Sequence, residues 1–165
     1  MSSITLYPDL PCSYPTTVGL NETLVGDSST LIAAFRNNSS IANLRAVLQT
    51  MHLLPHEPSA DTLMTIQFIA QPTVIGGTWN SITGSQLEIN TTASSFISGK
   101  VALTLYSDVS AAHGNSPATA STANEDMSNL GLELYVGQVF AVVAQCETAS
   151  ATTHLAWSFN WLEKD

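Results

Sequence analysis

The C-terminal segment alternates large apolar residues with small or polar ones, which is the pattern of a β-strand with one buried face. The large side chains occupy every second position: Leu155, Trp157, Phe159 and Trp161. Between them lie His154, Ala156, Ser158 and Asn160. Full burial of each large side chain contributes roughly 1.5 to 3 kcal/mol. This face therefore requires either a deep core or a subunit interface.

Shorter apolar or alternating segments predict further strands along the chain. They are Thr30–Arg36, Leu63–Ala70, Gln86–Asn90, Lys100–Tyr106 and Gly137–Cys146. The last of these is apolar on both faces, as a central strand would be. Together with the turns between them, the segments predict an all-β fold: a single antiparallel β-sandwich over residues 26–165.

One segment, Ile41–Leu54, fits two kinds of secondary structure. Its apolar residues fall at helical spacing and many of its residues are good helix formers, so local propensity favours a helix. The same residues also alternate with a period of two. Both alternatives stay open from these residues alone.

Turn-forming residues predict the connections. Pro55–Asp61 is a loop by composition, and Ser107–Ala123 is predicted as a long loop. Asn124–Leu130 is predicted to form one helical turn. The glycine pair at 76 and 77 predicts a bend, with Trp79 filling the corner that the bend creates.

Residues 1–25 are predicted as an extended N-terminal arm, because three prolines fix the backbone and remove donors. A disordered tail is one interpretation. The other is an arm that lies on a partner protein, since the segment contains apolar and aromatic residues that a partner could bury: Ile4, Leu6, Tyr7, Leu10 and Tyr14.

Charge excludes two classes of partner. The 165-residue chain has a formal net charge of −9, and its four basic residues are scattered. Nucleic acids and anionic membranes both require clustered Lys and Arg, so we expect neither as a partner. No segment has the pattern of a secretory signal or a transmembrane helix. Cys12 and Cys146 are predicted to be free, packed thiols, with a disulfide between them as the open alternative.

No motif predicts catalysis, a metal site or a cofactor. His52, His56 and Glu57 have the wrong order for a zincin helix, and Pro55 interrupts any helix there. No nucleophile elbow or phosphate-binding glycine loop occurs. A hydrolase that uses His56 is therefore a minor hypothesis. Sugar binding by Trp79 and the 107–123 loop is a second one, because exposed aromatic rings stack on sugars.

Several stretches together resemble the small structural proteins of tailed-phage virions. They are FRNNSS, NLRAVLQTMHL, IQFIAQPTVIGGTWNSI, LEINTTASSFISGK and GQVFAVVAQCETASATTHLAWSFNWLE, within residues 30–165. That group includes capsid decoration (cement) proteins and small fibre or collar proteins with jelly-roll-like sandwiches. The resemblance implies a jelly roll, and with it a strand at Ile41–Leu54.

The resemblance also implies a function. We expect a non-enzymatic protein that binds the outside of a phage head, contacts the major capsid protein and assembles as a homotrimer. It would be made in the host cytoplasm and located on the virion. The alternative is a small head-fibre, collar or tail component that exposes its loops to the host. Tyr7, Tyr14 and Trp157 are the candidate partner-binding residues.

Overall fold

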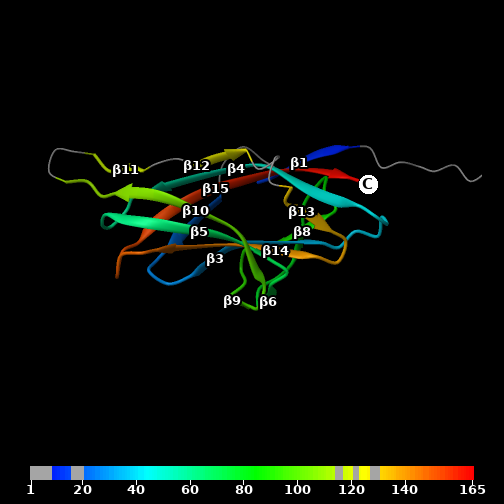
Figure 1. Ribbon diagram of the computed structural model, residues 1–165, viewed down its shortest axis with the longest axis horizontal. Coiled ribbons are helices and arrows are strands. Elements are labelled where there is room, and N and C mark those ends of the chain that lie inside the picture. The colour runs from blue at the N-terminus through cyan, green and yellow to red at the C-terminus, as the bar shows by residue number, and fades with distance from the viewer. Residues whose placement is uncertain (1–8, 16–20, 114–116, 121–122, 127–130) are drawn as a thin grey trace, which may run out of the picture.

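Two antiparallel sheets face each other across the core of the computed structural model (Figure 1). The structure describes residues 9–15, 21–113, 117–120, 123–126 and 131–165. Every regular element in these ranges is a strand. The prediction of an all-β antiparallel sandwich is therefore confirmed. No helix long and apolar enough to cross a membrane occurs in the described part of the chain.

The first sheet has two long strands at its centre, which pair with each other along their whole length. On one side, β1 and β2 both pair with β15, one with each half of it. On the other side, β12 and β13 both pair with β4. The strands are β1 (Leu10–Tyr14), β2 (Asn21–Val25), β4 (Arg45–His56), β12 (Ala123–Asp126), β13 (Glu133–Tyr135) and β15 (Thr153–Lys164).

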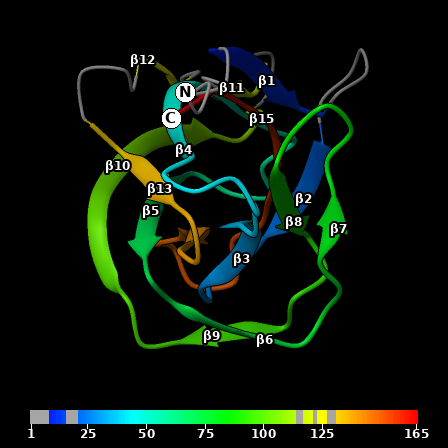
Figure 2. The same cartoon turned by 90° about the vertical axis from the view of Figure 1, so that its right-hand side faces the viewer.

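The second sheet has the order β11-β10-β5-β14-β3-β8-β7. Its strands are β3 (Thr30–Asn37), β5 (Thr62–Ala70), β7 (Asn80–Ser81), β8 (Leu87–Asn90), β10 (Lys100–Ser110), β11 (Thr119–Ala120) and β14 (Val139–Cys146). β14 lies between β5 and β3, which confirms the prediction of a central strand. A separate two-stranded ribbon consists of β6 (Thr73–Ile75) and β9 (Ser95–Ile97) (Figure 2).

The core between the sheets contains all four large side chains of the C-terminal strand. Leu155, Trp157, Phe159 and Trp161 are each at most 3% exposed. From the opposite sheet, Phe35 places its ring 5.3 Å from that of Phe159 and 6.0 Å from that of Trp161, both with edge-to-face geometry. Of the two alternatives predicted for this face, a deep core and a subunit interface, the structure shows the deep core.

A second, smaller apolar cluster lies on the outer face of the second sheet. It consists of Ala34, Ile69, Ala141 and Val143. The segment that contains β6 and β9 covers it with Val74, Trp79 and Phe96. Trp79 is half-buried there, and the Arg36 guanidinium lies 4.6 Å from the centre of its ring. The glycine pair that precedes Trp79 has positive φ at both residues, as the predicted bend requires.

The ambiguous segment is a strand. β4 begins at Arg45, so the strand implied by the resemblance is confirmed and the helical alternative is wrong. The loop predicted from Pro55 begins too early, because β4 continues through Pro55 and His56. At Pro55 the strand pairs with β15, and among the described residues β12 reaches only to Leu53 on the other side. Proline is tolerated in a strand where no neighbour needs its missing N–H.

Two other local predictions are wrong. The expected loop Ser107–Ala123 begins inside β10, which runs to Ser110 because Ser107 and Val109 face the core. The expected helical turn at Asn124–Leu130 is strand β12 as far as Asp126, since pairing with β4 overrides local propensity. Residues 127–130 lie outside the described residues.

The described part of the N-terminal segment forms edge strands of the first sheet. Pro11 lies in β1, which pairs with β15 and with no other strand among the described residues. The boundary predicted at residue 25 falls inside the core, because Val25 is fully buried. Residues 1–8 and 16–20 lie outside the described residues, so contact between the arm and a partner stays a prediction.

Candidate functional site

The three candidate partner-binding residues have different positions. Tyr7 lies outside the described residues. Tyr14 is half-buried in β1, and its ring stacks on Trp157 with centroids 5.8 Å apart. Trp157 is 1% exposed and donates its indole N–H to the Thr23 hydroxyl at 3.1 Å. Tyr14 and Trp157 thus join both edge strands to the core, and partner binding by them stays a prediction.

The outer face of the first sheet carries exposed apolar side chains. Leu24 on β2 is 56% exposed and Leu54 on β4 is 39% exposed. Ala156 of β15 is opposite Leu54 in register and lies between the two strands. We call this surface the outer sheet face and define it by Leu24, Leu54, Ala156, Glu22, His56 and His154. The sequence pattern gave no sign of it, because its residues come from three distant segments.

Two histidines and one carboxylate lie among the apolar side chains of the outer sheet face. His154 Nδ1 lies 2.7 Å from Glu22 Oε1, and His56 Nε2 lies 3.4 Å from the same oxygen. The two imidazole rings are 5.5 Å apart. Register explains the grouping, since His56 and His154 are directly opposite each other. Within the described ranges, no group of three or more His, Cys, Asp or Glu is arranged to hold a metal ion.

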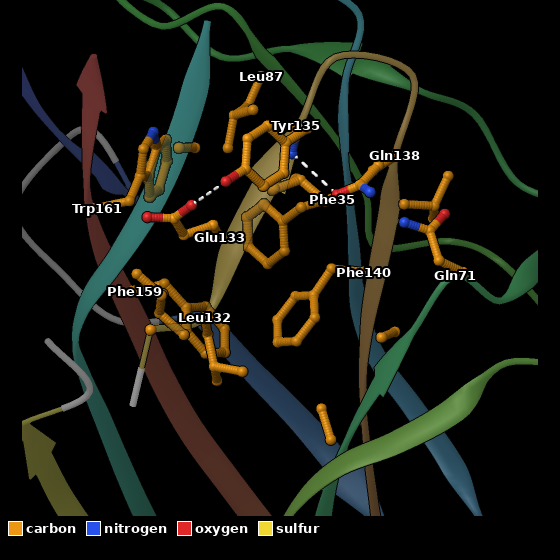
Figure 3. Close-up of a pocket in the computed structure, with 17 residues that line it drawn as sticks. Phe35, Gln71, Leu87, Leu132, Glu133, Tyr135, Gln138, Phe140, Phe159 and Trp161 are labelled. Carbon is orange, nitrogen blue, oxygen red and sulfur yellow. Dashed lines mark hydrogen bonds between the residues drawn. The ribbon is translucent and has the colours of Figure 1, made fainter. Parts of the chain in front are cut away.

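A pocket of about 480 Å³ opens between the two sheets, at the end where β13 turns into β14. Figure 3 shows its wall, which consists mainly of aromatic and aliphatic side chains. The aromatic members come from both sheets: Phe35, Tyr135, Phe140, Phe159 and Trp161. Three alanines, Ala46, Ala70 and Ala102, contribute little side-chain volume and so leave space.

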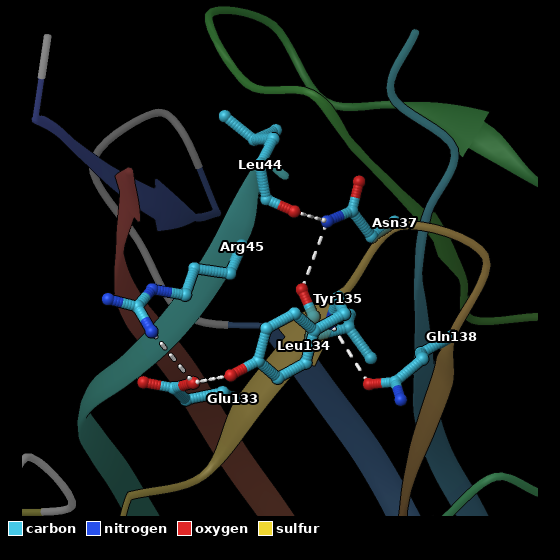
Figure 4. A network of polar contacts seen from close by, with 7 residues as sticks. All are labelled: Asn37, Leu44, Arg45, Glu133, Leu134, Tyr135 and Gln138. Carbon is cyan, nitrogen blue, oxygen red and sulfur yellow. Dashed lines mark hydrogen bonds and ion pairs between the residues drawn. The ribbon is translucent and has the colours of Figure 1, made fainter. Parts of the chain in front are cut away.

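One side of the pocket is β13, and polar contacts fix this short strand (Figure 4). The Glu133 carboxylate accepts a hydrogen bond from the Tyr135 hydroxyl and forms an ion pair with Arg45 at 3.3 Å. The Tyr135 hydroxyl and then the Glu133 charge raise the pKa of Arg45 above its ordinary value. Buried Asn37 donates to the carbonyls of Leu44 and Leu134, each at 3.0 Å.

The mouth of the pocket carries two neutral amides. Gln138 accepts the backbone N–H of Tyr135 through Oε1 at 3.0 Å, which orients its side chain. Gln71 lines the mouth near it (Figure 3) and has a positive φ of 56°. Glu133 is the one charged residue among those that line the pocket, and its charge is balanced by Arg45. The lining is therefore apolar inside and neutral at the mouth.

Both cysteines are free, which confirms the prediction of unpaired thiols. Burial and then the charge of Glu163 raise the pKa of Cys12 to about 11. Burial and then the charges of Asp27 and Glu147 raise the pKa of Cys146. Because the thiolate is the reactive form, neither cysteine is activated as a nucleophile.

Neither a model of a known protein family nor any curated protein sequence matches the chain. The resemblance to virion proteins therefore stays a prediction from the sequence. The pocket and the outer sheet face are the two surfaces on which a function can be argued from the structure itself.

Proposed function

We propose that the chain is a non-enzymatic structural protein of a tailed-phage virion. It binds the outside of the head, contacts the major capsid protein and stabilises the shell as a decoration protein. The alternative within the same class is a small head-fibre, collar or tail component. In either role the protein contributes buried area between subunits and performs no turnover.

Strand order supports this proposal most directly. Eight strands form one run of four paired neighbours in each sheet: β2, β3, β4, β5, β10, β13, β14 and β15. We number these eight strands 1 to 8 in chain order. The first sheet, β2-β15-β4-β13, then has the order 1-8-3-6, and the second, β3-β14-β5-β10, has the order 2-7-4-5. We infer a jelly roll from this order. Jelly rolls are common in viral capsid and lectin domains.

The outer sheet face is the surface that we assign to the capsid contact. Its exposed leucines would lose water on binding, which favours association by roughly 25 cal/mol per Å² of apolar area removed. Glu22 contacts His56 and His154, and the strand register places Glu22 and His154 between the two leucines. The face therefore combines apolar and polar side chains, as protein interfaces do.

Binding to undecorated heads tests the proposal. Purified protein is mixed with heads produced without it, and co-sedimentation should give saturation at a fixed number of copies per head. Leu24→Asp and Leu54→Asp should each weaken binding at least tenfold. The matched control is Ile97→Asp, since Ile97 is 58% exposed but lies on the β6–β9 ribbon.

Three results would contradict or redirect the proposal. Heads that bind no protein at saturation would contradict a decoration role. Equal losses for Ile97→Asp and Leu24→Asp would contradict the assigned face. Binding to a glycan array that is lost in Trp79→Ala would favour the lectin-like alternative. Solution mass, measured separately by light scattering, should correspond to a homotrimer.

A further inference from the structure

The pocket between the sheets has no role in a purely structural protein. Protein interiors are normally packed as densely as organic crystals, and unfilled volume in a core lowers stability. The pocket of about 480 Å³ is roughly three times the size of an engineered 150 Å³ cavity that stays dry and binds benzene. It also falls within the range of about 300 to 1,000 Å³ that small-molecule sites occupy.

The wall of the pocket selects an apolar ligand. Phe35, Phe140, Phe159 and Trp161 present ring surfaces to the space (Figure 3), and no buried polar side chain interrupts them in the part of the wall that the structure describes. Water in such a space would find few hydrogen-bond partners. An apolar molecule has no hydrogen bonds to lose in this space, and it gains dispersion contacts with the rings.

The mouth restricts the ligand's charge. Glu133 and Arg45 form an ion pair, so the residues that line the pocket offer no unpaired cation. An anionic head group at the mouth would lose hydration without gaining a cationic partner among these residues. The neutral amides of Gln71 and Gln138 can instead exchange hydrogen bonds with an uncharged polar group.

We propose that this pocket binds an uncharged amphipathic small molecule, with its apolar part among the four aromatic rings and a hydroxyl-type polar group at Gln71 and Gln138. The site is distinct from the outer sheet face and does not depend on the proposed virion role. Its nearest reporters are the indole N–H of Trp161, which donates to Glu163 at 3.1 Å, and the backbone amide of Tyr135.

Titration with octan-1-ol, followed by ¹H–¹⁵N correlation spectra, tests the proposal. Saturable chemical-shift changes are expected at Trp161, Tyr135 and Gln138. The amide signals of the β6–β9 ribbon should not shift. Octanoate has the same chain length with a negative head group, and it should bind at least tenfold more weakly. Absence of saturable shifts, or equal binding of octanoate, would overturn the proposal.

A variant in which a new side chain occupies the pocket tests where the alcohol binds. Ala102 lines the pocket but is exposed on β10, so Ala102→Trp places a large ring at the pocket with little risk to the core. Octan-1-ol affinity should fall at least tenfold in this variant. Ala112→Trp introduces the same ring at an exposed position outside the pocket and should leave the affinity unchanged. Equal affinities in the two variants would place the bound alcohol elsewhere and reject the site.

Discussion

At the scale of single residues, the most unusual group is the buried carboxylate of Glu163. It is fully buried near the end of β15 and accepts hydrogen bonds from the Ser85 hydroxyl, the Gln86 backbone N–H and the Trp161 indole. These bonds fasten the turn before β8 to the opposite sheet. The same charge acts on Cys12, which lies half-buried in β1.

The reactivity of Cys12 should reveal this environment. Because its pKa is raised to about 11, iodoacetamide should alkylate Cys12 at pH 8 about a hundredfold more slowly in the folded chain than in urea. The rate should keep rising through pH 10. Peptide mass spectrometry separates Cys12 from Cys146. In Glu163→Gln the alkylation rate of Cys12 should begin to rise at a lower pH. A wild-type rate that stops rising near pH 9 would contradict the raised pKa of Cys12.

The raised pKa of Cys12 also affects stability. The unfolded chain ionises this thiol near pH 9 while the folded chain keeps it protonated to about pH 11. Its contribution to stability is therefore complete below the unfolded pKa and is lost as the pH rises toward the folded value.

Asn37 shows how one side chain positions an element. It is 1% exposed, and its amide joins the start of β4 to β13 through the carbonyls of Leu44 and Leu134. Asn37→Ala would leave both carbonyls without this donor, so we expect the free energy of unfolding to fall by about 3 kcal/mol. Urea denaturation measures it. Asn38→Ala, at the exposed neighbouring position, should stay within about 0.5 kcal/mol of wild type.

At the scale of elements, the covering of the second sheet depends on one glycine. A Cβ at Gly77 would lie 2.4 Å from Asn90 Oδ1 and 2.5 Å from the Ala93 nitrogen. Gly84 also has a positive φ but meets nothing within 4 Å. Left-handed backbone costs alanine roughly 1 to 2 kcal/mol at either position. Gly77→Ala should cost about 2 kcal/mol beyond that, because the neighbouring backbone must move. Urea denaturation measures the loss of unfolding free energy in Gly77→Ala and in Gly84→Ala. Equal losses in the two variants would show that crowding at Gly77 is unimportant.

Elements with a strong pattern could be predicted from the sequence. The alternation in β15 and the two-sided apolar run in β14 correctly gave a core strand and a central strand. The sequence misled where pairing decides the structure. Ala123–Asp126 has the composition of a helix start, yet it pairs with β4, and Ser107 is a small polar residue in a buried row of β10. No local signal distinguishes such positions.

The two candidate surfaces could not be predicted for a related reason. The pocket wall combines side chains from both sheets, and the outer sheet face combines β2, β4 and β15. Both depend on strand order and register, which are long-range properties. The sequence identified Trp79 as a corner residue but gave no sign of Arg36 over its ring.

At the scale of the whole molecule, charge is divided between the two ends of the sandwich. All four Lys and Arg residues lie at the end of the pocket: Arg36, Arg45, Lys100 and Lys164. The opposite end carries loops that are joined by hydrogen bonds. Four acidic residues lie in these loops: Asp27, Glu57, Asp61 and Glu147. The hydrogen bond from His113 lowers the pKa of Asp61, so this carboxyl stays charged even in mild acid.

Repulsion within this acidic end should limit stability at low salt. Raising NaCl from about 20 mM to about 500 mM shortens the Debye length several-fold, so the Tm should rise by about 3 °C. Glu57→Lys places a cation among the acids and should raise the Tm at low salt while reducing its salt dependence. Asp9→Lys changes the net charge equally at the N-terminal edge strand and should have the smaller effect. Scanning calorimetry at pH 7 measures both, and equal salt slopes in the two variants would mean that net charge, and not its placement at one end, sets the effect.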